Sequence, residues 1–256
     1  MLALYHWEPT ANSAEPLICL EEKALDYESH YVNLLRLEQH RPAFLQLNPQ
    51  GQVPVLVHDG RVITETSLMI QYLDASFPQV ALAPQAAPDR YLMHVWLRTS
   101  DDYFGPALAM LGWHRGGGAA NLQVELSPSA LANLARLPPE RQAVWKAALE
   151  DSYGEEQLGA ARDSLSIVAK RLENALTGSG WLAGSAYSLA DIAIFPMARS
   201  LGRLLPEVLN EALTPSVTAW LRRIEERPAV RAVLQRARSA APEAMFAPGP
   251  EPARWG

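Results

Sequence analysis

The stretch TANSAEP, residues 10–16, places an amide and a hydroxyl, Asn12 and Ser13, where a short apolar run gives way to a helical pattern. The first N–H groups of a helix lack partners inside the helix, and the positive end of the helix dipole lies there. Such a start stabilises an anion, including a thiolate. Asn12 and Glu15 also have the spacing of a capping box, which would make the stretch an ordinary helix cap. Both interpretations stay open, because a cap residue can also face a ligand.

Glu65 and Thr66 stand at the start of another helical pattern, just after a predicted β-hairpin. A carboxylate there can bind an ammonium group, while a hydroxyl and a helix N-terminus can bind a carboxylate. Together these groups suit an α-amino acid. The alternative is that Thr66 caps the helix and Glu65 is a solvated loop residue.

Two further segments have polar or backbone features that suit ligand binding. Pro54 interrupts an apolar run at its start, which fits either an edge-protecting proline or a cis Val53–Pro54 bond. Gln39, His40 and Arg41 precede a short helix and can bind a second carboxylate, or form a solvated loop.

Composition excludes several other classes of protein. The single cysteine, Cys19, rules out a disulfide framework and a cysteine-rich zinc site, and the six histidines lack metal-ligand spacing, so no metal is expected. A net charge of −6 argues against a broad nucleic-acid-binding surface. No run approaches the ~20 apolar residues of a membrane span. The N-terminus lacks the pattern of a signal peptide, so a cytoplasmic location is expected.

Residues 1–78 predict an α/β unit in the order β-α-β-α-β-β-α, with Asp59-Gly60 as the hairpin turn. Residues 79–88 contain two prolines and are expected to form a linker. Residues 89–239 predict an all-α domain, and residues 240–256 a disordered tail. Within the helical part, one apolar stripe has clean helical spacing; its members are Leu158, Leu165, Val168, Leu172 and Leu176.

A long stretch between residues 104 and 152 is expected to be irregular, because it contains Gly116-Gly117-Gly118, Ser127-Pro128 and Pro138-Pro139. Loops of this length in compact domains are usually functional or disordered. We expect a cover over a binding cleft, with a flexible insertion as the alternative.

Taken together, these segments resemble the glutathione transferase superfamily from about residue 2 to residue 238. EQHRPAFLQLNPQGQVPVLVHDGRVITETSLMIQYL (38–73) is similar to its glutathione-site segment. YSLADIAIFP (187–196) is similar to its buried capping box and hydrophobic staple, with Ser188 as the cap and Asp191 at N3. ERPAVRAVL (226–234) resembles its last helix. The resemblance implies a thioredoxin-like N-terminal domain and an all-α C-terminal domain.

A narrower resemblance is to the bacterial lignin β-aryl etherases of the sphingomonad type. It is carried by Asn12-Ser13 before Pro16, EQH at 38–40, the insertion after DDYF (101–104), and PERQAVWKAA (139–148). This resemblance implies that glutathione is the cosubstrate and that its thiolate attacks Cβ of an α-keto β-O-4 aryl ether, releasing a phenol. Two alternatives are a transferase for other electrophiles or peroxides, and a non-catalytic protein with the same fold.

The resemblance also implies roles for individual residues. Asn12 and Ser13 would contact the sulfur, with Thr10 as the alternative nearest the usual serine of serine-type members. Pro54 would be cis, leaving the backbone of Val53 to pair with the cysteinyl unit, and Cys19 would be a packed thiol rather than a catalyst. The remaining glutathione ligands implied are Gln39, His40, Gln52, Glu65, Thr66 and Asp101, with Arg41 nearby. The residues expected to line the aromatic substrate are Trp7, Tyr103, Phe104, Trp113, Gln142 and Trp145.

The usual assembly of the superfamily is a dimer. A homodimer is therefore expected, with a heterodimer formed with a paralogue as the alternative. Asp101 would bind the γ-glutamyl ammonium, in one arrangement across the dimer interface.

Overall fold

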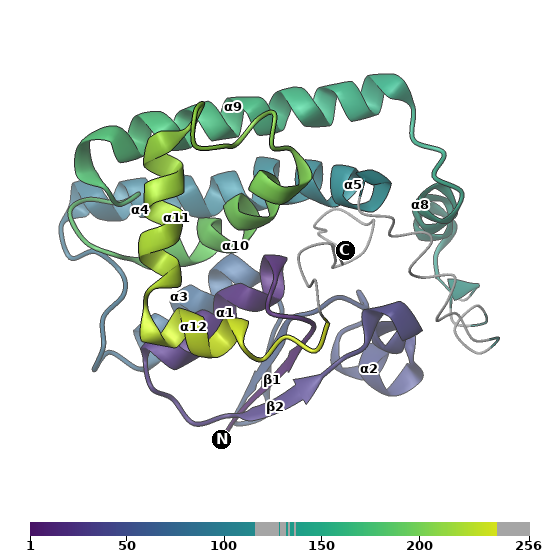
Figure 1. Cartoon of the computed structure of the whole chain (residues 1–256). Helices are drawn as coiled ribbons and strands as arrows, with labels where there is room; N and C mark the ends of the chain where they lie inside the picture. Colours follow the sequence, from purple (N-terminus) through teal and green to yellow (C-terminus); the bar gives the residue numbers. More distant parts are fainter. Residues whose placement is uncertain (116–127, 129–131, 133, 136, 240–256) are drawn as a thin grey trace.

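The computed structural model describes residues 1–115, 128, 132, 134, 135 and 137–239. Figure 1 shows a small sheet and its helices below a layer of longer helices. The N-terminal unit is thioredoxin-like and the rest is helical, as the sequence predicts. The predicted tail, 240–256, lies outside the described residues.

The sheet has four strands in the order β2-β1-β3-β4. The central strand β1 (Leu2–His6) pairs in parallel with β2 (Glu28–Tyr31) and antiparallel with β3 (Val55–His58), which pairs with β4 (Arg61–Ile63). Parallel neighbours need a crossover, and α1 (Ala11–Glu22) supplies it. The predicted turn joins β3 and β4, with positive φ at both Asp59 and Gly60. The predicted element order is thus confirmed.

The helices around the sheet carry the segments that matter for the site. Two single 3-10 turns, η1 (Leu34–Arg36) and η2 (Glu38–His40), precede the short helix α2 (Pro42–Leu47). Helix α3 (Thr66–Ser76) follows β4 and ends just before Phe77-Pro78. Pro54, the hairpin and α3 therefore lie on one continuous segment of chain.

The helical layer begins earlier than the sequence indicates, because Pro88 fits the first turn of α4 (Ala87–Thr99). A π-helical segment, η3 (Ser100–Phe104), leads into α5 (Gly105–Arg115), and α8 (Pro139–Leu149), α9 (Glu155–Ser179) and α10 (Leu189–Leu204) follow. Helix α11 (Pro215–Glu225) packs against α9 and α10, and α12 (Pro228–Leu234) packs against α1. The predicted apolar stripe of α9 is buried along its whole length.

The expectation of an irregular stretch from 104 to 152 is wrong for its two ends, which are helices α5 and α8. Pro138-Pro139 does not break a helix but begins one, because a proline in the first turn loses no internal hydrogen bond. The glycine-rich part, residues 116–127, lies outside the described residues.

Helix α1 lies at the centre of the molecule, packed against α3, α10 and α12. One hydrophobic core therefore runs from the sheet into the helical layer, with Ile18, Phe195 and Trp220 among its fully buried side chains. Cys19 is buried in it, as predicted, and burial raises the pKa of its thiol. The predicted box at α10 is also present: Ser188 caps the helix and Asp191 accepts the Ser188 N–H at 2.9 Å.

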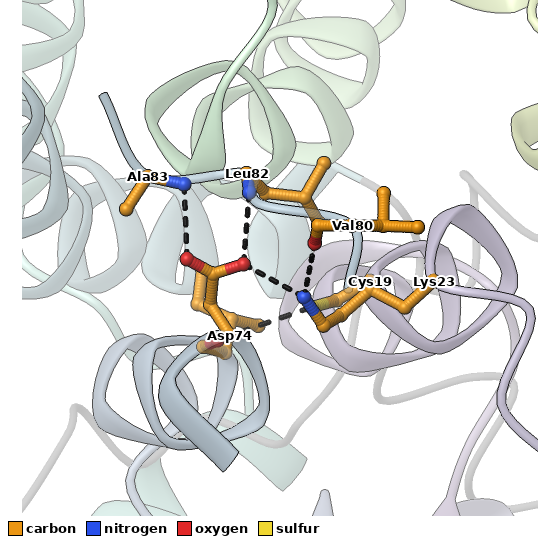
Figure 2. A network of polar contacts seen from close by, with 7 residues as sticks. Cys19, Lys23, Asp74, Val80, Leu82 and Ala83 are labelled. Atoms are coloured by element: carbon orange, nitrogen blue, oxygen red, sulfur yellow. Dashed lines mark hydrogen bonds and ion pairs between the residues drawn. The ribbon is translucent and has the colours of Figure 1, made fainter. Parts of the chain in front are cut away.

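A buried ion pair joins α1, α3 and the connection between the two units (Figure 2). The Lys23 ammonium lies 2.8 Å from Asp74 and also donates to the carbonyl of Val80. The Asp74 carboxylate accepts the backbone N–H groups of Leu82 and Ala83 at 2.8 and 3.0 Å. Residues 80–83 are thereby held against both helices.

Candidate active site

The start of α1 differs from the predicted cap. The N-cap is Thr10, with no side-chain cap bond, so the capping box predicted for Asn12 and Glu15 is wrong. Ala11 has a positive φ of 43°, a conformation that few non-glycine residues adopt. The Thr10 hydroxyl is buried and lies 3.5 Å from the Ser200 hydroxyl of α10. The Thr10 side chain therefore does not cap the first backbone N–H groups of α1.

Asn12 and Ser13 are adjacent but have different surroundings. Ser13 is buried, and its hydroxyl oxygen accepts the backbone N–H of Trp7 at 3.1 Å. Asn12 is half-buried and has no hydrogen-bond partner for its amide among the described residues. The amide of Asn12 is therefore available to a ligand at the positive end of α1.

The segment before β3 has the geometry that a peptide-like ligand needs. The Val53–Pro54 bond is cis, as predicted, and both residues are buried. Asn48 orders the approach to it, because its amide donates to the carbonyl of Gln52 at 2.8 Å. Gly51 has a φ of 64°, and a Cβ there would lie 2.8 Å from the ring of His40. Only glycine fits this close contact without a shift.

Gln39 and His40 are both buried, and helix α8 contacts His40. The rings of His40 and Trp145 meet edge to face at 5.5 Å, and Arg141 donates to the carbonyl of Gln50. Neither amide atom of Gln39 has a hydrogen-bond partner among the described residues. A buried amide without partners is costly, so a polar ligand there would be stabilised. Figure 1 shows α8 at the end of the helical layer nearest α2.

Glu65 is the N-cap residue of α3, and Thr66 is its first residue. The next residue, Ser67, donates to Asp101 at 2.6 Å and so joins α3 to η3. Burial raises the pKa of Asp101 and of Glu65, and the charge of Asp101 raises that of Glu65 further. These carboxyl groups form an acidic region at the start of α3, which suits an ammonium group.

Sequence reasoning missed two residues of this region, Ser67 and Glu15. Ser67 directly follows the predicted pair, and a serine after Glu-Thr at a helix start was a signal available in the sequence. Glu15 is 1% exposed, and burial followed by the charge of Asp101 raises its pKa well above the usual range. It was assigned to the capping box instead.

The six residues expected to line the aromatic substrate do not form one wall. Trp113 and Trp145 meet at 5.8 Å in a small cluster with Leu37, and Trp7 packs against Tyr31 on the sheet. Phe104 is fully buried in the main core, whereas Tyr103 and Gln142 are exposed.

One cavity lies against α8, and another lies between β2 and α2. A cavity of about 220 Å³ has Gln142 and Trp145 among its lining residues, and one of about 630 Å³ lies between β2 and α2, with Arg41 among its lining residues. Within the described ranges, no cluster of metal-ligating side chains occurs and no helix is long and apolar enough to span a membrane.

Comparison with known proteins agrees with this geometry. Residues 4–81 match the family model for the glutathione S-transferase N-terminal domain, and residues 137–228 match that for the C-terminal domain. The protein LigF of Sphingobium sp. strain SYK-6 is 34% identical over 243 residues, 93% of this chain and 94% of LigF. The crystal structure of the β-etherase LigF superposes with a TM-score of 0.85, covering 92% of this chain and 99% of that one.

A second solved structure bears on the ligand. It is a glutathione transferase from Pseudomonas putida with one glutathione disulfide bound per subunit; it is 25% identical, with a TM-score of 0.71, and covers 92% of this chain and 91% of its own. Both halves of this chain match, over nearly its whole length. The chain belongs to the glutathione S-transferase family.

Proposed function

We propose that this protein is a glutathione-dependent β-aryl etherase. The observation that carries the proposal is the whole-length similarity to LigF, at 34% identity and a TM-score of 0.85. The cis Val53–Pro54 bond and the acidic start of α3 support glutathione as the cosubstrate. A protein used only as a scaffold has no need of these features.

In this proposal, glutathione lies across the N-termini of α1 and α3. The backbone of Val53 pairs with the cysteinyl unit, with Gln52 beside it, and Gln39 and His40 face the glycyl carboxylate. Glu65, Thr66 and Asp101 hold the γ-glutamyl end. The thiol then lies at the start of α1, next to Asn12 and Ser13. Thr10 is the alternative residue for the sulfur contact.

The reaction begins with ionisation of the thiol. A free alkyl thiol has a pKa of about 8.5, and the N-terminus of a helix lowers it. The thiolate attacks Cβ of an α-keto β-aryl ether, a carbon–sulfur bond forms, and the carbon–oxygen bond breaks with its electron pair on the phenolate. The thiol's proton passes to solvent on ionisation, and the phenolate, whose phenol has a pKa of about 10, takes a proton back from solvent. The protein contributes chiefly by holding thiolate and carbon in line.

Release of a phenol tests the proposal. We expect the protein to release phenol from a β-aryl ether ketone only when glutathione is present, and to turn over a chlorinated nitroarene more slowly. A faster reaction with the nitroarene would favour a general transferase. Failure to bind a glutathione affinity column would favour a non-catalytic role.

We also propose that the protein forms a homodimer. Leu68 and Tyr103 are 52% and 60% exposed, and they lie one and two residues along the chain from Ser67 and Asp101, which are hydrogen-bonded to each other. Large apolar side chains exposed at one place commonly mark an interface. Asp101 therefore lies close to the proposed interface.

A further inference from the structure

Glu8 is a buried acidic residue in the β1–α1 loop (residues 7–10), and its carboxylate contacts two other segments of the chain. It is 1% exposed. The hydroxyl of Tyr31, the last residue of β2, donates to its Oε1 atom at 2.7 Å. The backbone N–H of Arg238 donates to its Oε2 atom at 2.8 Å, and the Arg238 guanidinium lies 3.8 Å from the centroid of the Tyr31 ring. Each carboxylate oxygen therefore has a donor, which offsets the cost of burying it.

One of these donors belongs to the C-terminal segment, residues 235–239, which follows α12. This segment contacts both ends of α1. At the far end of α1, the Arg236 side chain donates to the carboxylate of Glu21. At the near end, Arg238 donates to Glu8 through its backbone. The C-terminal segment therefore reaches from the end of α1 to the loop that precedes it.

The β1–α1 loop leads directly into the proposed thiol site. It turns sharply, because the N–H of Thr10 donates to the carbonyl of Glu8 at 2.7 Å. The Trp7 N–H donates to the hydroxyl oxygen of Ser13 at 3.1 Å, and the Trp7 ring packs in one cluster with Val53. A shift of Glu8 would therefore move the start of α1 relative to the segment proposed to pair with the cysteinyl unit.

We propose that Glu8 is a positioning residue for the thiol site, and that the C-terminal segment holds it in place. The inference rests on the glutathione function proposed above. In this role Glu8 does not contact the ligand. It fixes where the first N–H groups of α1 and the Asn12 amide lie relative to the sulfur. A thiolate loses stabilisation when these donors move away, because the effect of a helix N-terminus falls off within the first turn.

Substitution of Glu8 in the full chain tests this role. Glu8→Ala removes both acceptors, whereas Glu8→Gln keeps an oxygen for the Arg238 N–H and an amide that can donate to the Tyr31 hydroxyl. We expect Glu8→Ala to raise the pKa of bound glutathione, measured by thiolate absorbance in the ultraviolet, and to lower kcat for phenol release by about tenfold. Affinity for S-methylglutathione, which has no thiol to ionise, should change little. Glu8→Gln should restore both the thiol pKa and kcat.

A second pair of variants leaves Glu8 intact. Arg238→Pro removes the backbone donor to Glu8, whereas Arg238→Ala keeps it. We expect Arg238→Pro to shift the thiol pKa and kcat in the same direction as Glu8→Ala, and Arg238→Ala to shift them less. Arg236→Ala is the matched control, because it weakens the contact of the same segment with the far end of α1. It should leave the thiol pKa unchanged.

An unchanged thiol pKa and kcat in Glu8→Ala and Arg238→Pro would overturn the role of Glu8 and leave the glutathione function intact. If Glu8→Ala does not fold, the comparison of Arg238→Pro with Arg238→Ala decides. An equal rise of the thiol pKa in Arg236→Ala would also overturn the role, because the effect would then not depend on Glu8. Absence of any binding of S-methylglutathione by the unmodified protein would overturn both the inference and the proposed function.

Discussion

Asn12 and Ser13 share the start of α1. The Asn12 amide is half-buried and has no hydrogen bond to the described residues, whereas Ser13 accepts the N–H of Trp7 and keeps its O–H as a donor but is buried. A donor aimed at a developing anion commonly contributes about two orders of magnitude in rate. The structure therefore favours Asn12 as the sulfur contact.

We predict that Asn12→Ala lowers kcat/KM for phenol release by about 100-fold, because a donor to the thiolate is lost. The pKa of bound glutathione should rise, which thiolate absorbance in the ultraviolet measures directly. Ser13→Ala is the matched comparison and should lose less activity. A larger loss in Ser13→Ala than in Asn12→Ala would transfer the sulfur contact to Ser13.

Local sequence could indicate some site residues and not others. Glu65 and Thr66 were recognisable because their positions follow from a hairpin turn and a helix start, both local signals. Glu15 was not, because its burial depends on elements that pack against α1 and are distant in the chain, such as α3 and α10. The Asn12–Glu15 spacing is the same whether the N-cap is Asn12 or, as observed, Thr10, two residues earlier.

At the scale of elements, the Lys23–Asp74 pair fixes how α3 is oriented on α1. We predict that Lys23→Met lowers the free energy of unfolding by about 3 kcal/mol, because it leaves a carboxylate buried without its cation. Asp74→Ala should cost more, since the N–H groups of Leu82 and Ala83 also lose their acceptor. Urea unfolding measures both.

The double variant Lys23→Met with Asp74→Ala provides the control. Because the two residues interact, its loss should be smaller than the sum of the single losses. Additive losses would show that the ion pair contributes little and that the backbone bonds of Asp74 dominate.

The cap of α10 should make stability depend on pH. Burial raises the pKa of Asp191, and the hydrogen bonds that it accepts from Trp220, Leu182 and Ser188 lower this pKa. Burial is the larger effect, and the resulting pKa is about 6. The native state therefore holds the proton more tightly than the unfolded chain, whose carboxyl has a pKa of about 3.9. This contribution to stability is present at low pH and is lost as the pH rises through about 6.

We predict that the unfolding free energy of the unmodified protein, relative to Asp191→Asn, falls by about 2 kcal/mol between roughly pH 4 and pH 7. The variant has no titrating group at this position, so other carboxyl groups cancel in the comparison. A relative rise over the same interval would mean that the hydrogen-bond donors outweigh the cost of burial.

At the scale of the whole molecule, the fold was predictable because its signals are periodic and local, such as the α9 stripe and the Asp59-Gly60 turn. The position of α8 was not. Its docking depends on the contact of Trp145 with His40 and on the hydrogen bond from Arg141 to the carbonyl of Gln50, and these partners lie about a hundred residues apart in the chain. Trp145 packs against the ring of His40 in the N-terminal unit and also lines the cavity of about 220 Å³, so its place in a substrate site stays a prediction.

Assembly is the last property at this scale, and Leu68 tests it. We predict that the unmodified protein sediments as a dimer and that Leu68→Arg sediments as a monomer, because a charge would be buried in the proposed interface. Ile167→Arg is the matched control: Ile167 is 60% exposed on α9, similar to Leu68 at 52%, but it is not beside the Ser67–Asp101 bond. If both variants remain dimeric, the interface lies elsewhere, and Asp101 acts only within its own subunit.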